Sequence, residues 1–150
     1  MKSRLVWQAA GERTYVLVLD AGDEAFAAIT DFASKNELGG ASLTALGAFE
    51  RATVGWFDLR ARTYRPIEID EQCEGLSLLG DIAIGDDGKA SLHVHIVLGL
   101  SDGSTRGGHL LDGKVRPTLE VVVTETPSKL RRKKRKDLGI ALIDIAAGQG

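Results

Sequence analysis

Every second residue from Leu92 to Leu98 is aliphatic, and this pattern restricts the segment to a β-strand with one buried face. Side chains on a strand point alternately to its two sides. One side of this strand is aliphatic, with Leu92, Val94, Ile96 and Leu98. The other side carries His93 and His95. Two such imidazoles, roughly 6.5–7 Å apart at Cβ, can converge on one metal ion with Zn–N bonds of about 2.0–2.1 Å.

The third histidine of the chain, His109, follows a Gly107-Gly108 step. A turn at residues 101–103, Ser-Asp-Gly, can fold a second strand back beside the first and bring His109 to the pair. All the histidines therefore lie within a stretch of 17 residues, at a spacing that suits chelation. We predict a divalent metal site of His93, His95 and His109, with zinc as the expected ion. The alternative is three ordinary hydrogen-bonded histidines. Glu50 and Glu120 could add a carboxylate.

The remainder of the chain reads as one helix among short strands. The helix is expected to begin with Asp23 and Glu24 and to stop by residues 38–40, Leu-Gly-Gly. Strands are expected at 14–20, 41–49, 53–59, 64–70, 75–84, 118–124 and 140–145. This order predicts an α+β fold, with a large, mostly antiparallel β-sheet and one main flanking helix. The histidines should lie on the sheet face that the helix leaves free, in a groove or against a neighbouring subunit.

Length and composition are typical of one domain. We expect residues 1–150 to form a single domain with a core at about 14–145 and a frayed tail at 146–150. The chain has one cysteine, Cys73, so an intrachain disulfide is excluded and a reducing cytoplasm is indicated. It has no apolar run of about 18 residues, which predicts no membrane span. Its first residues lack the apolar centre of a secretory signal.

Residues 129–136 form a basic run with seven Lys and Arg side chains. Without them, 12 basic residues face 21 acidic ones, a net charge of −9. This asymmetry is typical of an arm that binds a polyanion such as DNA without sequence preference. The candidate contacts are Arg131, Arg132, Lys133, Lys134, Arg135 and Lys136. The alternative is a solvated hairpin strand, with a turn at residues 137–139 and a returning strand at 140–145.

Four blocks of this sequence carry a family resemblance, and together they span roughly residues 15–145. They are GAFERATVGWF at 47–57, LSLLGDI at 76–82, His93-x-His95 and Gly-Gly-His-Leu at 107–110. In order and spacing they resemble the PPC (plants and prokaryotes conserved) domain family, in its prokaryotic stand-alone form. The resemblance implies an antiparallel sheet with a flanking helix, a homotrimer, and a fold like that of acetolactate decarboxylase, a zinc enzyme with a similar three-histidine arrangement.

The family also suggests a function. Its plant members combine the domain with AT-hook motifs and assemble nuclear proteins, and its prokaryotic members are often described as DNA-binding. This sequence lacks the Arg-Gly-Arg-Pro core of an AT-hook and has all three histidines, which favours the metal-binding prokaryotic type. We therefore expect a non-enzymatic, trimeric, DNA-binding or regulatory protein with a histidine metal site. The alternative is a small zinc-dependent lyase or hydrolase.

Overall fold

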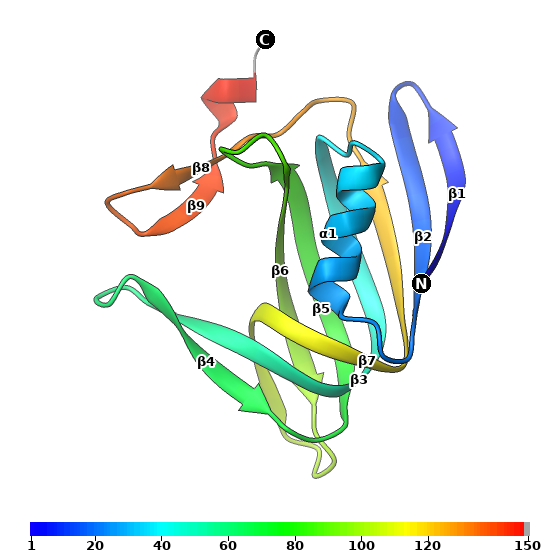
Figure 1. Cartoon of the computed structure of the whole chain (residues 1–150), viewed down its shortest axis with the longest axis vertical. Helices are drawn as coiled ribbons and strands as arrows, with labels where there is room; N and C mark the ends of the chain where they lie inside the picture. The colour runs from blue at the N-terminus through cyan, green and yellow to red at the C-terminus, as the bar shows by residue number, and fades with distance from the viewer. Residues whose placement is uncertain (149–150) are drawn as a thin grey trace.

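The computed structural model describes residues 1–148, so Gln149 and Gly150 of the expected frayed tail lie outside it. The described part contains nine strands, one α-helix and one 3-10 helix (Figure 1). In chain order they are β1 (Lys2–Ala9), β2 (Glu12–Asp20), α1 (Ala25–Lys35), β3 (Gly40–Asp58), β4 (Thr63–Ile69), β5 (Cys73–Ile84), β6 (Ala90–Gly99), β7 (Thr105–Glu125), β8 (Arg132–Arg135), β9 (Ile140–Ile143) and η1 (Ile145–Gly148).

The main sheet has seven strands in the order β1-β2-β7-β6-β5-β3-β4, and every pairing is antiparallel. The two long strands β3 and β7 also pair with each other. Strands β3, β5, β6 and β7 therefore form a closed circuit, and the sheet curls around its core. The expected α+β fold with a mostly antiparallel sheet and one helix is confirmed.

The helix α1 lies across the concave face of the sheet and contacts β6 and β7 (Figure 1). Glu24 is its N-cap: its carboxylate accepts hydrogen bonds from the backbone N–H groups of Phe26 and Ala27. The same carboxylate accepts the N–H of Gly113 at 2.9 Å, which ties the start of the helix to β7. The helix ends before the predicted glycines, because Glu37 adopts a positive φ of 53° and the N–H of Leu38 bonds back to Ala33.

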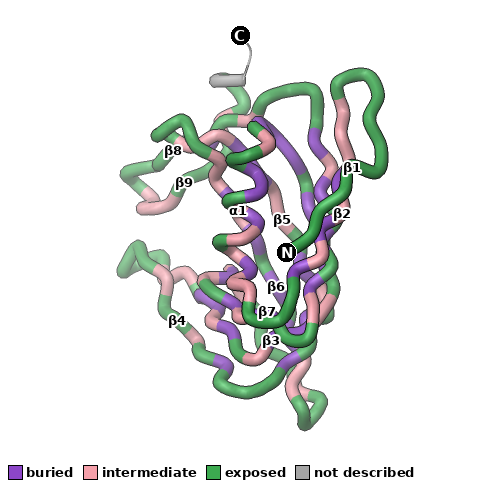
Figure 2. Tube along the Cα trace, turned by 45° about the vertical axis from the view of Figure 1, so that its right-hand side comes forward, coloured by how far each residue is buried: buried purple, intermediate pink, exposed green. Residues whose placement is uncertain are grey.

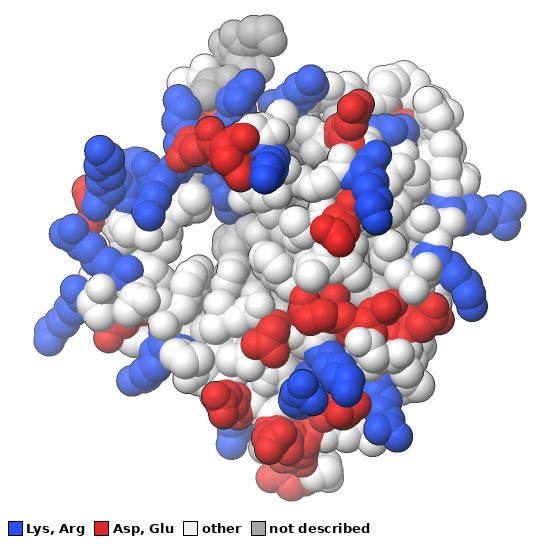
Figure 3. Space-filling view, in the orientation of Figure 1, with Lys and Arg blue, Asp and Glu red and all other residues white. Residues whose placement is uncertain are grey.

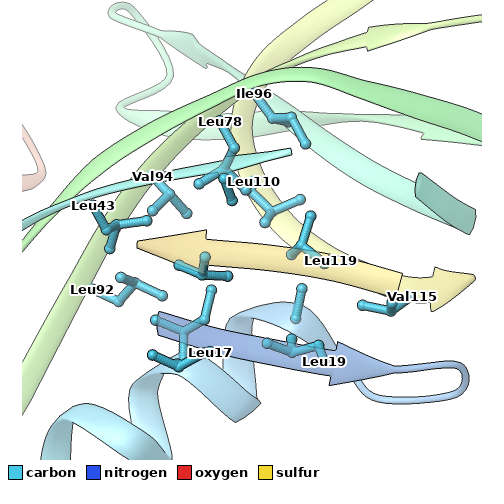
Figure 4. Packing of buried hydrophobic residues seen from close by; sticks show 14 of the residues in the cluster. Leu17, Leu19, Leu43, Leu78, Leu92, Val94, Ile96, Leu110, Val115 and Leu119 are labelled. Atoms are coloured by element: carbon cyan, nitrogen blue, oxygen red, sulfur yellow. The ribbon is translucent and has the colours of Figure 1, made fainter. Parts of the chain in front are cut away.

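The core lies between α1 and the concave face (Figures 2 and 4). Four helix residues, Ala25, Ile29, Phe32 and Ala33, are buried against it. The predicted aliphatic side of the histidine strand is buried there too, and Val94 and Leu98 are fully buried. Each such leucine or valine stabilises the fold by about 1.5–3 kcal/mol relative to an exposed one. The histidine side of β6 therefore faces away from the helix, as expected.

Three strands, β1, β3 and β7, differ from the prediction in their presence or length. The residues of β1 were not expected to form a strand. The two predicted pieces at 41–49 and 53–59 are one strand, β3. The expected returning strand with His109 and the expected strand at 118–124 are likewise one strand, β7, which is 21 residues long. Both long strands contain register shifts, at Gly47/Phe49, Phe49/Arg51 and Thr53/Val54 against β7. Each shift breaks the period-2 pattern, so a continuous strand reads as separate pieces.

The basic run forms the first strand of a hairpin. β8 pairs with β9 across a turn at residues 136–139, as the hairpin alternative predicted. In Figure 1 this hairpin projects from the body beside the end of β5. Residues 146–148 of the tail that was expected to fray lie in the 3-10 helix η1 (Ile145–Gly148). No helix in the described part is long and apolar enough to cross a membrane.

Candidate metal centre

Two neighbouring strands bring the three histidines together. His93 and His95 share the outer side of β6, and His109 of β7 lies directly opposite His95 in the antiparallel register. The ring centroids are 5.1–5.4 Å apart. One nitrogen from each ring lies within 4.8 Å of the other two, so the three side chains could hold one metal ion. The sequence predicted this group from spacing alone.

An aromatic ring fixes His109 from the side of β4. The Tyr64 ring stacks on the imidazole, with centroids 4.6 Å apart and planes 18° from parallel. Gly55 makes this stacking possible, because it lies opposite His109 on β3. A Cβ atom at Gly55 would be 2.7 Å from Cδ1 of Tyr64, so a larger residue would push the tyrosine off the histidine. Neither residue was predicted as part of the site.

A carboxylate and a guanidinium lie behind His93. Asp81 of β5 is opposite His93 in the register, and its Oδ2 atom is 3.7 Å from Nδ1 of the ring. The other carboxylate oxygen forms an ion pair with Arg132. Burial acts to raise the pKa of Asp81, but its partners His93 and Arg132 outweigh burial and hold that pKa below its usual value. Asp81 is therefore an ionised acceptor beside His93.

The chemistry of the three rings fits a metal. Burial, followed by the nearby His93 and His95, lowers the pKa of His109 to about 4. Burial and His93 also lower the pKa of His95. Both rings are thus neutral near pH 7, which is the form that binds metals. The Nδ1 atom of His109 is buried and has no hydrogen-bond partner in the described residues, an arrangement that is costly without a ligand.

This buried imidazole predicts a loss of stability in acid for the metal-free protein. The unfolded chain binds a proton on His109 near pH 6.5, whereas the folded chain does so only near pH 4. The contribution to the free energy of unfolding is therefore complete above pH 6.5 and is lost as the pH falls toward 4. The expected loss is on the order of 1–3 kcal/mol.

Urea unfolding at pH 7.5 and pH 4.5, with a chelator present, measures this loss. Between the two pH values, the free energy of unfolding should fall less in the variant His109→Gln than in the parent. The difference should be on the order of 1–3 kcal/mol. For three ordinary imidazoles, metal affinity would fall below about pH 6.5. Protons compete for His109 only near pH 4, so this ring should stay available at lower pH. Equal pH dependence in parent and variant would contradict the assignment.

The predicted basic contacts differ in their exposure to solvent. Five of them are exposed on the β8–β9 hairpin: Arg131, Lys133, Lys134, Arg135 and Lys136. Blue side chains gather there at the left of Figure 3. Arg132 differs from the expectation, because it is only 5% exposed and forms an ion pair with Asp81. A guanidinium in that position cannot contact a phosphate in solvent.

The prediction also missed Asp81. A hairpin with a loop of residues 85–88 would place Asp81 opposite Leu92, but Ile84 pairs with Ala90, so the loop is one residue longer and Asp81 lies opposite His93. Glu50, which was considered as a possible ligand, instead lies 3.2 Å from Lys114. Neither Glu50 nor Glu120 joins the histidine group among the described residues.

Solved structures of several prokaryotic proteins show the same fold. A plant- and prokaryote-conserved protein from Pyrococcus horikoshii is 30% identical, with a TM-score of 0.82 over 88% of this chain and 91% of that chain. A metal-containing protein from Archaeoglobus fulgidus is 29% identical, with a TM-score of 0.81 over 96% of this chain and 99% of that chain. A candidate DNA-binding protein from Bacteroides thetaiotaomicron is 26% identical, with a TM-score of 0.84 over 93% and 96%.

A more distant likeness concerns the fold alone. Acetolactate decarboxylase from Bacillus subtilis is 15% identical, with a TM-score of 0.56 over 85% of this chain and 58% of that chain. Among curated protein sequences, none matches this chain significantly. The profile of the Plants and Prokaryotes Conserved (PCC) domain matches residues 8–127, which include all three histidines. With this match and the likeness to the Pyrococcus protein, the chain belongs to the PCC domain family.

Proposed function

We propose that this protein binds one divalent cation through His93, His95 and His109, as the centre of a single-domain, non-enzymatic regulatory homotrimer in the cytoplasm. The observation that carries the metal site is the convergence of three imidazole nitrogens within 4.8 Å, one ring having a buried Nδ1 without a partner. The likeness to a metal-containing Archaeoglobus protein over nearly the whole chain supports it. Zinc is the ion we propose, because imidazole is among its preferred ligands.

The surroundings of the site favour a regulatory role over a zinc lyase or hydrolase. Three histidines leave a fourth metal position, which hydrolytic zinc enzymes fill with water next to an acid or base. Here the neighbouring carboxylate, Asp81, is engaged by Arg132 and faces His93. Glu50 is engaged by Lys114. Both carboxylates are committed to ion pairs, so neither is positioned to transfer a proton.

Metal analysis of protein purified without a histidine tag tests this function. We expect about one zinc per chain after dialysis against buffer free of chelator. We also expect a thermal unfolding midpoint that rises with added zinc, because a ligand that binds only the folded state stabilises it. Protein without zinc and with no response of its midpoint to zinc, cobalt or nickel would overturn the proposal.

An exposed apolar face supports the proposed homotrimer. It consists of five aliphatic residues on the convex side of the sheet, each more than 40% exposed: Leu46, Leu76, Leu79, Val97 and Val122. Leu46, Leu76, Leu79 and Val122 line one shallow groove, and Leu79 and Val97 line a second one that also includes His95. A continuous apolar surface of this kind marks an interface. The number three comes from the family resemblance.

A second function, weak binding of DNA, is favoured by the exposed part of the β8–β9 hairpin. We predict binding without sequence preference that weakens steeply with salt. Each phosphate that a lysine or arginine neutralises adds about 0.9 to the slope of log K against log salt. Replacing Lys133, Lys134, Arg135 and Lys136 by glutamine should flatten this slope and leave metal content and subunit number unchanged.

Fluorescence anisotropy with a labelled duplex at several salt concentrations measures the slope. The control replaces four exposed basic residues outside the hairpin and the β5–β6 turn, Lys2, Arg4, Arg51 and Arg106, by glutamine. It changes the net charge equally, so it should keep the steeper slope if the hairpin is the contact. Equal slopes in the two variants, or no binding by the parent protein at about 50 mM salt, would refute this prediction.

A further inference from the structure

The β8–β9 hairpin lies outside the family match at residues 8–127, yet it contacts the strand that carries Asp81. The backbone N–H of Ile84, at the end of β5, donates to the carbonyl of Leu130 at 2.8 Å. Just beyond β5, the Asp86 carboxylate accepts the N–H of Lys134 at 3.0 Å. The C-terminal hairpin is therefore docked at the end of β5, three to five residues beyond Asp81.

Arg132 is the one buried basic residue of this hairpin in the described structure. Its side chain is 6% exposed, whereas the Lys133 and Arg135 side chains are 54% and 57% exposed. A buried guanidinium is tolerated only when it is paired, because its desolvation costs several kcal/mol. Its partner is Asp81, so burial of the arginine fixes the carboxylate in place.

The opposite side of that carboxylate faces the metal site. Oδ2 of Asp81 is 3.7 Å from Nδ1 of His93, and β5 and β6 hold the two residues opposite each other. A carboxylate in this place favours a proton on Nδ1, which leaves the lone pair of Nε2 free for a metal. For His95 and His109, the described contacts include no such carboxylate.

We propose that Asp81 and Arg132 are positioning residues for the metal site, Asp81 by orienting His93 and Arg132 by orienting Asp81. Through this chain of contacts, a hairpin outside the family match helps to set the metal affinity. The inference rests on the proposed metal site. It assigns Arg132 to the metal centre, although the residue belongs to a run that otherwise faces solvent.

The test compares three variants. Arg132→Met removes the guanidinium and keeps an aliphatic side chain in the buried space. The double variant Asp81→Leu with Arg132→Met removes both charges and leaves neither one buried alone. Lys134→Met is the control, on the same strand but exposed. Zinc affinity is measured by competition with a chromogenic chelator. We expect the double variant to bind about 10–100-fold more weakly than the parent, Arg132→Met to lie between them, and the control to match the parent.

A second readout separates positioning from a general effect on folding. Long-range ¹H–¹⁵N spectra of the metal-free protein report which ring nitrogen of each histidine carries the proton. We expect His93 to hold its proton on Nδ1 in the parent and in Lys134→Met, and to lose this preference in the double variant. The tautomers of His95 and His109 should not change. A loss of folded structure alone would change the tautomers of all three histidines or of none.

The two proposals fail in different ways. A parent protein that binds no zinc overturns the metal site, and the inference with it. A parent that binds zinc, with a double variant of equal affinity and an unchanged His93 tautomer, overturns the positioning role and leaves the metal site standing. Circular dichroism and urea unfolding show that each variant is folded under the conditions of both measurements.

Discussion

Replacing His93, His95 and His109 together by alanine should abolish zinc binding and leave the fold intact. The three rings supply every protein ligand of the proposed site, and they lie on the outer side of β6 and β7, away from the helix. The core residues between them, such as Val94 and Ile96, point to the opposite face and keep their packing. Far-UV circular dichroism should therefore be unchanged, while metal content falls from about one ion per chain to none.

The same variant should lose its thermal response to zinc. At zinc concentrations about 100-fold above the dissociation constant, binding should stabilise the parent by about 2.7 kcal/mol. The variant should show no such stabilisation. Ser91→Ala is the matched control, because Ser91 lies on the same side of β6, two residues before His93. It should retain metal and the response. Stoichiometric zinc in the triple variant would show that the ion binds elsewhere.

The variant Leu79→Glu should convert the proposed homotrimer to monomers. Leu79 is 58% exposed and lies where the two grooves of the apolar face meet. A glutamate buried there in each subunit would lose its water, at a cost of several kcal/mol per charge that the neutral imidazole of His95 opposite it does not offset. In a single subunit this residue faces solvent, so the monomer should still fold. Light scattering at micromolar concentration should return three chain masses for the parent and one for the variant.

Leu59→Glu provides the control for this experiment. Leu59 is 73% exposed and lies in the turn between β3 and β4, outside the apolar face. The same charge there should leave the mass of three chains unchanged. A parent that is monomeric at micromolar concentration would overturn the homotrimer. If the Leu79→Glu protein had the mass of the parent assembly, the interface would have to lie on another surface.

Local periodicity was sufficient to predict several parts of this protein. The alternation at 91–98 identified β6, and it separated the aliphatic residues of the core from His93 and His95. The turn at 101–103 predicted that His109 lies on a returning strand beside the pair. The turn residues 137–139 indicated the β8–β9 hairpin. In each case the signal lies within a few residues, because a strand with one buried face repeats every two residues and a tight turn selects its own residues.

Contacts between distant segments were decided only by the tertiary structure. Tyr64 stacks on His109 across 45 positions of sequence because Gly55 leaves room for its ring. Arg132 lies in a run whose other basic residues are exposed, yet it is buried and forms an ion pair with Asp81, 51 residues earlier in the chain. The period-2 pattern predicts which residues share a side of one strand. It does not predict which strands are neighbours, because the order of the strands depends on how β3 and β7 bend and pair across the whole sheet.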